Sequence, residues 1–192
     1  MTQLLTRLYL VRHGETEENV AGILQGHLPG TLTARGRKQV AALRESLTPS
    51  HFDAILSSDL KRAADTAEIL NEGLHLPLTL TPLLRERDWG GLTGCPYKQA
   101  RVDQFPADVE SLEAMFERAG RFLRFAWDNY AGQRVLVVTH GLYARCIQAV
   151  HGGLTLRDVP RMENTEVRLI EMKNAPVQVD RGVEGPDVVS AN

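Results

Sequence analysis

The chain has 192 residues, of which 43% are hydrophobic and 24% are charged, and its formal net charge is −2. These values are typical of one globular domain with a sizeable core, and they exclude a disordered chain and a membrane protein. Because the chain is not basic overall, it has no general attraction to nucleic acid or to anionic lipid, so any anion site must be local.

The first predicted element is a short buried strand, residues 8–11, which runs into Arg12 and His13 and stops at Gly14. In α/β sheets, ligands bind at the carboxyl ends of the strands. A guanidinium group suits phosphate oxygens, and a neutral imidazole is a nucleophile near neutral pH. The pair alone would also fit a structural cap on the strand, so its function depends on what the rest of the chain brings to it.

The glycine-rich residues 22–31 predict a surface loop near the end of the first strand. A helix is predicted over residues 32–47, because apolar residues recur there at helical spacing. Thr33 is its expected N-cap.

A second strand is predicted over residues 52–56, which closes on two serines. A helix leaves it at once over residues 59–71, with Ser58 as the expected N-cap and Gly73 as the expected stop. A third strand is predicted over residues 76–84.

A long polar connection, residues 85–106, follows the third strand, and connections of this length inside a domain are usually functional. Apolar periodicity then predicts the longest helix and the last strands. The remaining elements are a helix over residues 111–130, a buried strand over 134–140, a helix over 142–150 and a strand over 167–172.

Strands that alternate with helices predict an α/β fold in which helices cover both faces of a mainly parallel sheet. We expect one domain over residues 1–173 and a loosely ordered tail over 174–192, which has few large apolar residues. The carboxyl ends of parallel strands share one edge of the sheet. Three polar pairs should therefore meet there: Arg12 with His13, Ser57 with Ser58, and Thr139 with His140.

Two of the predicted strands end in His-Gly, at His13 and at His140. Arg62 lies in the first turn of the helix after the second strand, and helical side chains lean toward the amino end of their helix. We therefore expect Arg62 at the same edge, although by itself it would also fit a solvated residue beside Lys61. Two histidines and two arginines around one edge predict a phosphate or carboxylate site, and arginines supply the charge stabilisation that phosphoryl transfer needs.

Five segments resemble the histidine phosphatase superfamily, branch 1, which is the phosphoglycerate-mutase-like family. They cover most of the chain, from about residue 8 to residue 169, in the expected order. The resemblance implies a three-layer α/β/α fold with a central mainly parallel sheet, and hydrolysis of a small phosphorylated metabolite with inorganic phosphate as a product. The segments are RHGET with Asn19 following, SSDLKRAADTA, LLRERDWGGLTG, ESLEAMFERAGRFL and VLVVTHG.

The resemblance also implies roles for particular residues. His13 resembles the nucleophile that becomes phosphohistidine, and Glu86 resembles the proton donor to the leaving oxygen and later the base for water. Since His13 must be neutral and Glu86 protonated, we expect a bell-shaped pH–rate profile. No metal or organic cofactor is implied. The residues expected to contact the phosphate or line its pocket are Arg12, Arg62 and His140, together with Asn19, Gln25, Gly26 and Gly141.

Two other functions stay open beside that of a phosphatase. A 2,3-bisphosphoglycerate-dependent phosphoglycerate mutase is the first, but mutases of this family carry a longer basic insertion between the Glu86 and His140 positions. The short interval here favours hydrolysis. A phosphate-binding regulatory protein without turnover is the second. Arg87 and Asp88 replace an apolar pair and Leu142 replaces a glycine of the family pattern, which leaves the substrate open.

The cysteines and the remaining histidines indicate no further chemistry. Cys95 and Cys146 are far apart and are expected as free thiols, which fits a reducing compartment. The first residues, MTQLLTRLYLVRHG, match neither a signal peptide nor a membrane helix, so we expect a cytoplasmic protein without nucleic-acid or membrane partners. Without HxxxH or HExxH spacing, the other histidines are expected in loops or on the surface: His27, near the end of the first strand, and His51, His75 and His151.

Overall fold

The computed structural model describes residues 4–100 and 105–176. Within these residues, five strands form one sheet in the order β3-β2-β4-β1-β5. Strands β1 to β4 run parallel to one another, and β5 runs antiparallel to β1, which confirms a mainly parallel sheet. The strands are β1 (Thr6–Arg12), β2 (Ala54–Ser58), β3 (Leu78–Thr81), β4 (Arg134–Thr139) and β5 (Val167–Met172).

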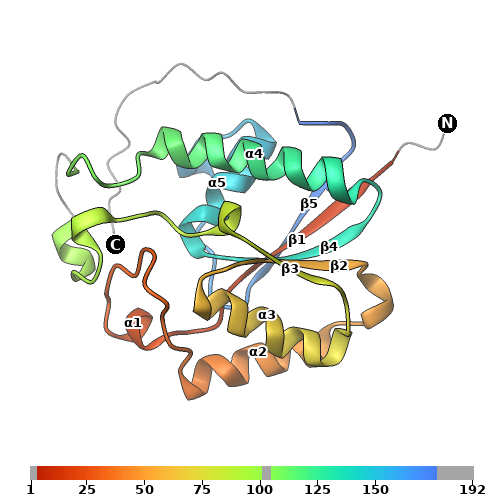
Figure 1. Cartoon of the computed structure of the whole chain (residues 1–192), viewed down its shortest axis with the longest axis horizontal. Helices are drawn as coiled ribbons and strands as arrows, with labels where there is room; N and C mark the ends of the chain where they lie inside the picture. The colour runs from red at the N-terminus through yellow and green to blue at the C-terminus, as the bar shows by residue number, and fades with distance from the viewer. Residues whose placement is uncertain (1–3, 101–104, 177–192) are drawn as a thin grey trace.

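Helices cover both faces of the sheet and make three layers, as Figure 1 shows: α4 and α5 lie on one face, and α2 and α3 on the other. The α/β/α architecture predicted from the sequence is therefore confirmed. The helices are α1 (Glu17–Val20), α2 (Ala34–Ser46), α3 (Lys61–Leu74), α4 (Leu112–Tyr130) and α5 (Gly141–Gly152). Short 3₁₀ turns lie at Pro49–His51, Pro82–Leu84, Gly90–Leu92, Tyr97–Ala100 and Leu156–Asp158.

Strand β4 shows why the sheet is covered on both faces. Successive side chains of a strand point to opposite faces. Val135 and Val137 pack in the cluster under α4 and α5, whereas Leu136 and Val138 pack in the cluster under α2 and α3. The unbroken apolar run VLVV, residues 135–138, is thus the pattern of a strand that is buried on both sides.

The start of α3 differs from the prediction. Ser58 is the last residue of β2, and Leu60 occupies the N-cap position without a side-chain hydrogen bond. The hydroxyl of Ser58 accepts a hydrogen bond from the backbone N–H of Leu60 and also pairs with the imidazole of His140. Predicting Ser58 as the N-cap was wrong by two residues, because the chain turns once more before the helix begins.

The end of α3 and the third strand also differ from the prediction. Gly73 lies inside α3, and the helix ends at His75, which takes a left-handed φ of 54°. The side chain of Asn71 bonds both backbone groups of Leu76 and so stabilises this turn. Strand β3 spans four residues rather than the predicted nine, because Pro82 lacks an N–H for the ladder and begins a 3₁₀ turn.

The remaining predicted elements agree with the structure to within one or two residues, including Thr33 as the N-cap of α2. The expected loose tail over residues 174–192 falls mostly on 177–192, which lie outside the described residues. In the described part of the chain, none of the helices combines the length and the apolar character needed to span a membrane.

Candidate active site

His13 directly follows β1 and continues its pairing with β4, since its backbone N–H donates to the Thr139 carbonyl at 3.0 Å. The side chain is almost fully buried, at 3% exposure. Its Nδ1 lies 2.7 Å from the carbonyl oxygen of Gly14. A carbonyl only accepts, so Nδ1 carries the hydrogen and Nε2 keeps a free lone pair.

The surroundings of His13 favour its neutral form. Burial, followed by the positive charges of Arg62 and Arg12, holds the pKa of His13 well below its ordinary value of 6.5. The imidazole is therefore uncharged at neutral pH, as a nucleophile must be.

His140 follows β4 and faces His13, with ring centroids 5.2 Å apart. Its Nε2 lies 2.9 Å from the hydroxyl of Ser58, at the end of β2. Its Nδ1 is buried and has no hydrogen-bond partner among the described residues. Burial, with the nearby charge of Arg62 as the next cause, also lowers the pKa of His140 well below 6.5.

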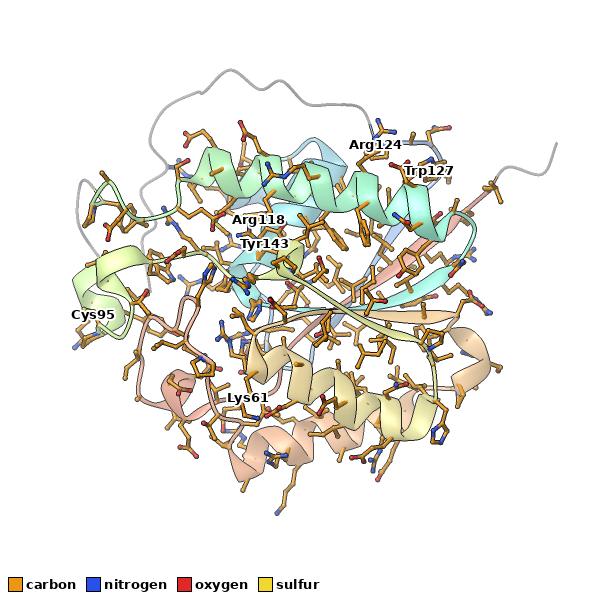
Figure 2. All side chains as sticks on the ribbon, viewed as in Figure 1. Lys61, Cys95, Arg118, Arg124, Trp127 and Tyr143 are labelled. Atoms are coloured by element: carbon orange, nitrogen blue, oxygen red, sulfur yellow. The ribbon has the colours of Figure 1, made fainter. Side chains whose placement is uncertain are left out.

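Arg62 is buried to 1% exposure, so the alternative of a solvated residue is wrong. Its Nη1 donates to the Leu28 carbonyl at 2.5 Å and its Nη2 to the Gly26 carbonyl at 2.9 Å. Burial lowers the pKa of Arg62 to about 10, which leaves it a cation at neutral pH. Its neighbour Lys61, labelled in Figure 2, is instead exposed and pairs with Asp65 on the surface of α3.

Arg12 ends β1, and its Nη1 donates to the Met162 carbonyl at 2.6 Å. A Cβ at position 141 would lie 3.2 Å from Arg12 Nε, so Gly141 lets α5 begin close against the guanidinium. The Nε atoms of Arg12 and Arg62 are buried and have no hydrogen-bond partner among the described residues. Buried donors without acceptors are costly, so the two guanidinium Nε atoms near one edge suit an anion.

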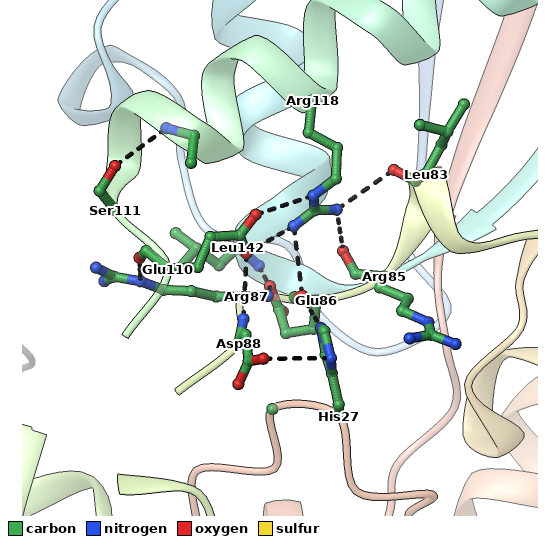
Figure 3. Close-up of polar contacts among 12 residues, drawn as sticks. His27, Leu83, Arg85, Glu86, Arg87, Asp88, Glu110, Ser111, Arg118 and Leu142 are labelled. Carbon is green, nitrogen blue, oxygen red and sulfur yellow. Dashed lines mark hydrogen bonds and ion pairs between the residues drawn. The ribbon is translucent and has the colours of Figure 1, made fainter. Parts of the chain in front are cut away.

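Glu86 lies in the connection after β3, and its carboxylate reaches the amino end of α5. Oε2 accepts the backbone N–H of Leu142 at 3.2 Å, and Oε1 accepts that of Arg87 at 2.9 Å. His27 approaches from the opposite side, where its Nε2 pairs with the Glu86 carbonyl at 3.1 Å (Figure 3). The acid expected from the resemblance therefore lies beside the helix that begins after His140.

Asn19 and Gln25 lie in the segments that follow β1. Asn19 Oδ1 accepts the backbone N–H of Thr16 at 3.2 Å and contacts Asn164 Nδ2 at 3.4 Å. Asn164 Nδ2 also donates to the His13 carbonyl at 2.9 Å, so a single side chain connects Asn19 with His13. Gln25 is buried, and its Oε1 has no partner among the described residues.

Two loops beside the site are joined by backbone hydrogen bonds, and we call residues 22–31 and 90–97 the paired loops. Leu24 N–H donates to the Cys95 carbonyl, and Gly94 N–H donates to the Leu24 carbonyl, both at 2.8 Å. Tyr97 N–H donates to the Gly22 carbonyl at 2.9 Å. Because Arg62 bonds the carbonyls of residues 26 and 28, Arg62 and both loops form one connected unit.

Cys146 is buried in α5, and burial raises the pKa of its thiol to about 12, so it is not a thiolate nucleophile. Cys95 is partly exposed in a paired loop. Over residues 4–100 and 105–176, no cluster of three His, Cys, Asp or Glu side chains has the arrangement of a metal site.

Some contacts that support the site were missed in the sequence. Ser58 was expected at this edge of the sheet and as a helix cap, but its hydrogen bond with His140 was not predicted, because it depends on the strand order. Asn164 lies in a stretch without a recognisable motif. Thr66, whose hydroxyl accepts a hydrogen bond from the backbone N–H of Gly14 at 3.2 Å, could have been predicted. It follows Arg62 by four residues and so lies on the same face of α3.

The fold and this site define a class of protein. A family model of the histidine phosphatase superfamily, branch 1, matches residues 8–183, and the chain belongs to this superfamily of enzymes. It is 36% identical over 155 residues to the uncharacterized phosphatase PhoE of Bacillus subtilis, a match that covers 79% of this chain and 77% of PhoE.

Two further relatives agree with this assignment. The chain is 46% identical over 149 residues to the adenosylcobalamin/α-ribazole phosphatase of Salmonella typhimurium, covering 70% of this chain and 73% of the relative. Among solved structures, YhfR of Bacillus stearothermophilus superposes with a TM-score of 0.82 at 30% identity, covering 93% of this chain and 98% of YhfR. The chain is thus an enzyme whose relatives include named phosphatases.

Proposed function

We propose that this enzyme is a phosphomonoesterase that hydrolyses a small phosphorylated metabolite through a phosphohistidine on His13. The observation that carries the proposal is the hydrogen bond from His13 Nδ1 to the Gly14 carbonyl at 2.7 Å. It leaves Nε2 as the free nucleophilic atom, in a buried site next to the cations Arg12 and Arg62.

In the first step, the Nε2 lone pair of His13 forms a bond to phosphorus while the P–O bond to the leaving group breaks. Glu86 gives its proton to the leaving oxygen. In the second step, Glu86 takes a proton from water, the water oxygen bonds to phosphorus, and the N–P bond breaks to release inorganic phosphate. The second step returns the proton to Glu86 and frees the lone pair of His13, so water is the co-substrate that completes the cycle.

The transferring group is held by buried donors that lack other acceptors. Arg12 Nε, Arg62 Nε and His140 Nδ1 supply them, and the Ser58 hydroxyl donates to His140 Nε2 so that Nδ1 carries the hydrogen. The other residues proposed to line the pocket are Asn19, Gln25, Gly26 and the backbone of Gly141.

The arginines near Glu86 support hydrolysis over mutase activity. A mutase needs free cations beside the acid to hold the second acidic group of its substrate, such as a carboxylate. In the described residues, three arginines from this interval or its start are occupied by contacts within the protein. Arg85 pairs with Asp59, Arg87 is buried against the rings of Trp89 and Phe105, and Arg118 pairs with Glu110.

The test is phosphate release over a panel of p-nitrophenyl phosphate, phosphoserine, α-ribazole phosphate and 3-phosphoglycerate. We expect release by the wild type, a loss on the order of 10³-fold in His13→Ala, and an acid-labile, alkali-stable phosphoenzyme in the wild type only. Isomerisation of 3-phosphoglycerate with 2,3-bisphosphoglycerate, at a rate above its hydrolysis, would assign the mutase function instead. Equal inactivity of wild type and His13→Ala would assign a binding protein.

A further inference from the structure

Arg118, on the face of α4 that looks toward the site, binds the main chain around Glu86 (Figure 3). Its Nη1 donates to the Arg85 carbonyl at 2.6 Å and to the Leu83 carbonyl at 3.3 Å. Its Nη2 reaches the Glu86 carbonyl at 3.4 Å. One guanidinium thus holds the backbone of the segment that carries the expected acid.

Glu110 completes the arrangement from the segment before α4. Its Oε1 and Oε2 accept Arg118 Nε and Nη2 at 3.0 and 2.8 Å, a two-pronged ion pair. Its Oε2 also accepts the backbone N–H of Asp88 at 3.1 Å, and its own N–H donates to the Asp88 carbonyl at 2.9 Å. The chain is therefore held on both sides of Glu86, before it by Arg118 and after it by Glu110.

The position of Arg118 is itself restrained by packing. Its side chain is 11% exposed, and its Cζ lies 3.9 Å from the ring centroid of Tyr143 (Figure 2). Tyr143 is fully buried in α5 and directly follows Leu142, whose N–H binds the Glu86 carboxylate. Arg118 contacts backbone carbonyls rather than that carboxylate, so any effect on the reaction passes through the orientation of Glu86.

We infer that Arg118 and Glu110 are a positioning pair for the general acid: together they hold the Glu86 carboxyl group in the direction of the leaving oxygen. This inference rests on the proposed role of Glu86. The phosphate-side residues Arg12, Arg62 and His140 belong to other elements, so loss of the pair weakens proton donation more than it weakens binding of the phosphoryl group.

The test compares substrates whose leaving groups differ in their need for a proton. The leaving group of p-nitrophenyl phosphate needs little protonation, whereas those of phenyl phosphate and of an alkyl phosphate need much more. We expect Arg118→Lys to lower kcat/KM for the alkyl phosphate at least about tenfold more than for p-nitrophenyl phosphate. General acid catalysis raises reaction rates on the order of 10²- to 10⁴-fold, so a misplaced acid can lose this much. The inhibition constant of inorganic phosphate stays within about twofold, which reports an intact phosphate site.

Three further single variants and one double variant make the result decisive. Arg121 lies on the same helix at an exposed position. Arg121→Lys is therefore the control, and we expect it to leave kcat/KM unchanged for both the alkyl phosphate and p-nitrophenyl phosphate. Glu110→Gln removes the charge of the partner and is expected to show the same selective loss as Arg118→Lys, so it carries the prediction if the arginine variant does not fold. We expect Glu86→Gln to show the largest loss of kcat/KM for the alkyl phosphate relative to p-nitrophenyl phosphate. Adding Arg118→Lys to Glu86→Gln should not increase this difference between the two substrates.

The two ways of failing are distinct. If Glu86→Gln lowers kcat/KM equally for all three substrates, the proposed role of Glu86 is wrong. The second failure is one in which Glu86→Gln is selective, but the folded Arg118→Lys and Glu110→Gln variants lower kcat/KM for every substrate by the same factor or leave it unchanged. The pair would then be structural only, and the inference would be overturned.

Discussion

The imidazole rings of His13 and His140 face each other edge to face, with centroids 5.2 Å apart and planes at 62°. The sheet register creates this relationship. Arg12 of β1 is level with Thr139 of β4, so the next residue of each parallel strand leaves the sheet at the same height. The pair therefore depends on strand alignment, and neither ring has to reach across a loop to meet the other.

The stability of the protein is expected to fall as the pH decreases from about 6.5 to about 5. Burial lowers the pKa of His13 and of His140 below 6.5, so in this range the unfolded chain takes up protons that the folded chain does not. Their stabilising contribution is complete above pH 6.5 and is lost as the pH falls, by up to about 1.4 kcal/mol per pH unit for each histidine. Urea unfolding at several pH values measures this slope. His140→Gln should reduce it, and a flat profile would contradict the prediction.

Ser58→Ala is expected to lower kcat/KM for p-nitrophenyl phosphate by about five- to tenfold, because a lost hydrogen bond is worth about 1 kcal/mol and His140 then loses its fixed tautomer. Ser57→Ala is the matched control, since this neighbouring hydroxyl is also buried but donates to the Ser58 carbonyl. Both variants should lose some thermal stability. Equal kcat/KM values for the two would show that the Ser58–His140 contact has no role in the reaction.

Gly36→Ala is expected to destabilise the fold by about 1–3 kcal/mol. A Cβ at Gly36 would lie 2.1 Å from the carbonyl oxygen of Glu15, in the segment that follows His13, so the backbone there must shift. Gly120→Ala, on α4, would meet no heavy atom within 4 Å of the new Cβ apart from the adjacent residues and backbone of its own helix, and it should stabilise the fold by about 0.5–1 kcal/mol. Thermal unfolding of the two variants should move in opposite directions, and a shift of the same sign in both would refute this.

Arg62→Lys is expected to reduce kcat/KM on the order of 100-fold, with a raised KM. A lysine cannot bond the carbonyls of Gly26 and Leu28 together and still present a planar donor edge to a phosphoryl group. Lys61→Ala removes the adjacent exposed cation, which pairs with Asp65, and should change kcat/KM by less than about twofold. Steady-state kinetics on both variants measures these changes. Full activity of Arg62→Lys would contradict the role of Arg62 as a planar donor to the phosphoryl group.

The sequence predicts the sheet edge well because the decisive signals are local. Four consecutive apolar or aromatic residues precede the Arg12-His13 pair, and four apolar residues precede the Thr139-His140 pair, which indicates strands inside a sheet. A glycine follows each histidine. Arg62 was placed correctly from its position in the first turn of a helix. These inferences needed only the direction of side chains along one element.

The supporting contacts could not be predicted, because they join segments that are distant in the sequence. Nothing around Asn164 indicates that its amide binds the His13 carbonyl. The interaction of Ser58 with His140 depends on β2 and β4 being neighbours, which the order of elements along the chain does not specify. The left-handed turn at His75 depends on the Asn71 side chain, and the usual glycine signal pointed to Gly73 instead.

The paired loops have a consequence for changing the substrate preference of this enzyme. Replacing residues 22–31 alone with a loop of different backbone conformation would move the N–H and the carbonyl of position 24 away from the Cys95 carbonyl and the Gly94 N–H. We expect such a variant to have poorly formed paired loops and a displaced Arg62, because Arg62 bonds the carbonyls of residues 26 and 28. Exchanging residues 22–31 and 90–97 together keeps the two loops matched to each other, so we expect a change of substrate preference made through these loops to require both of them.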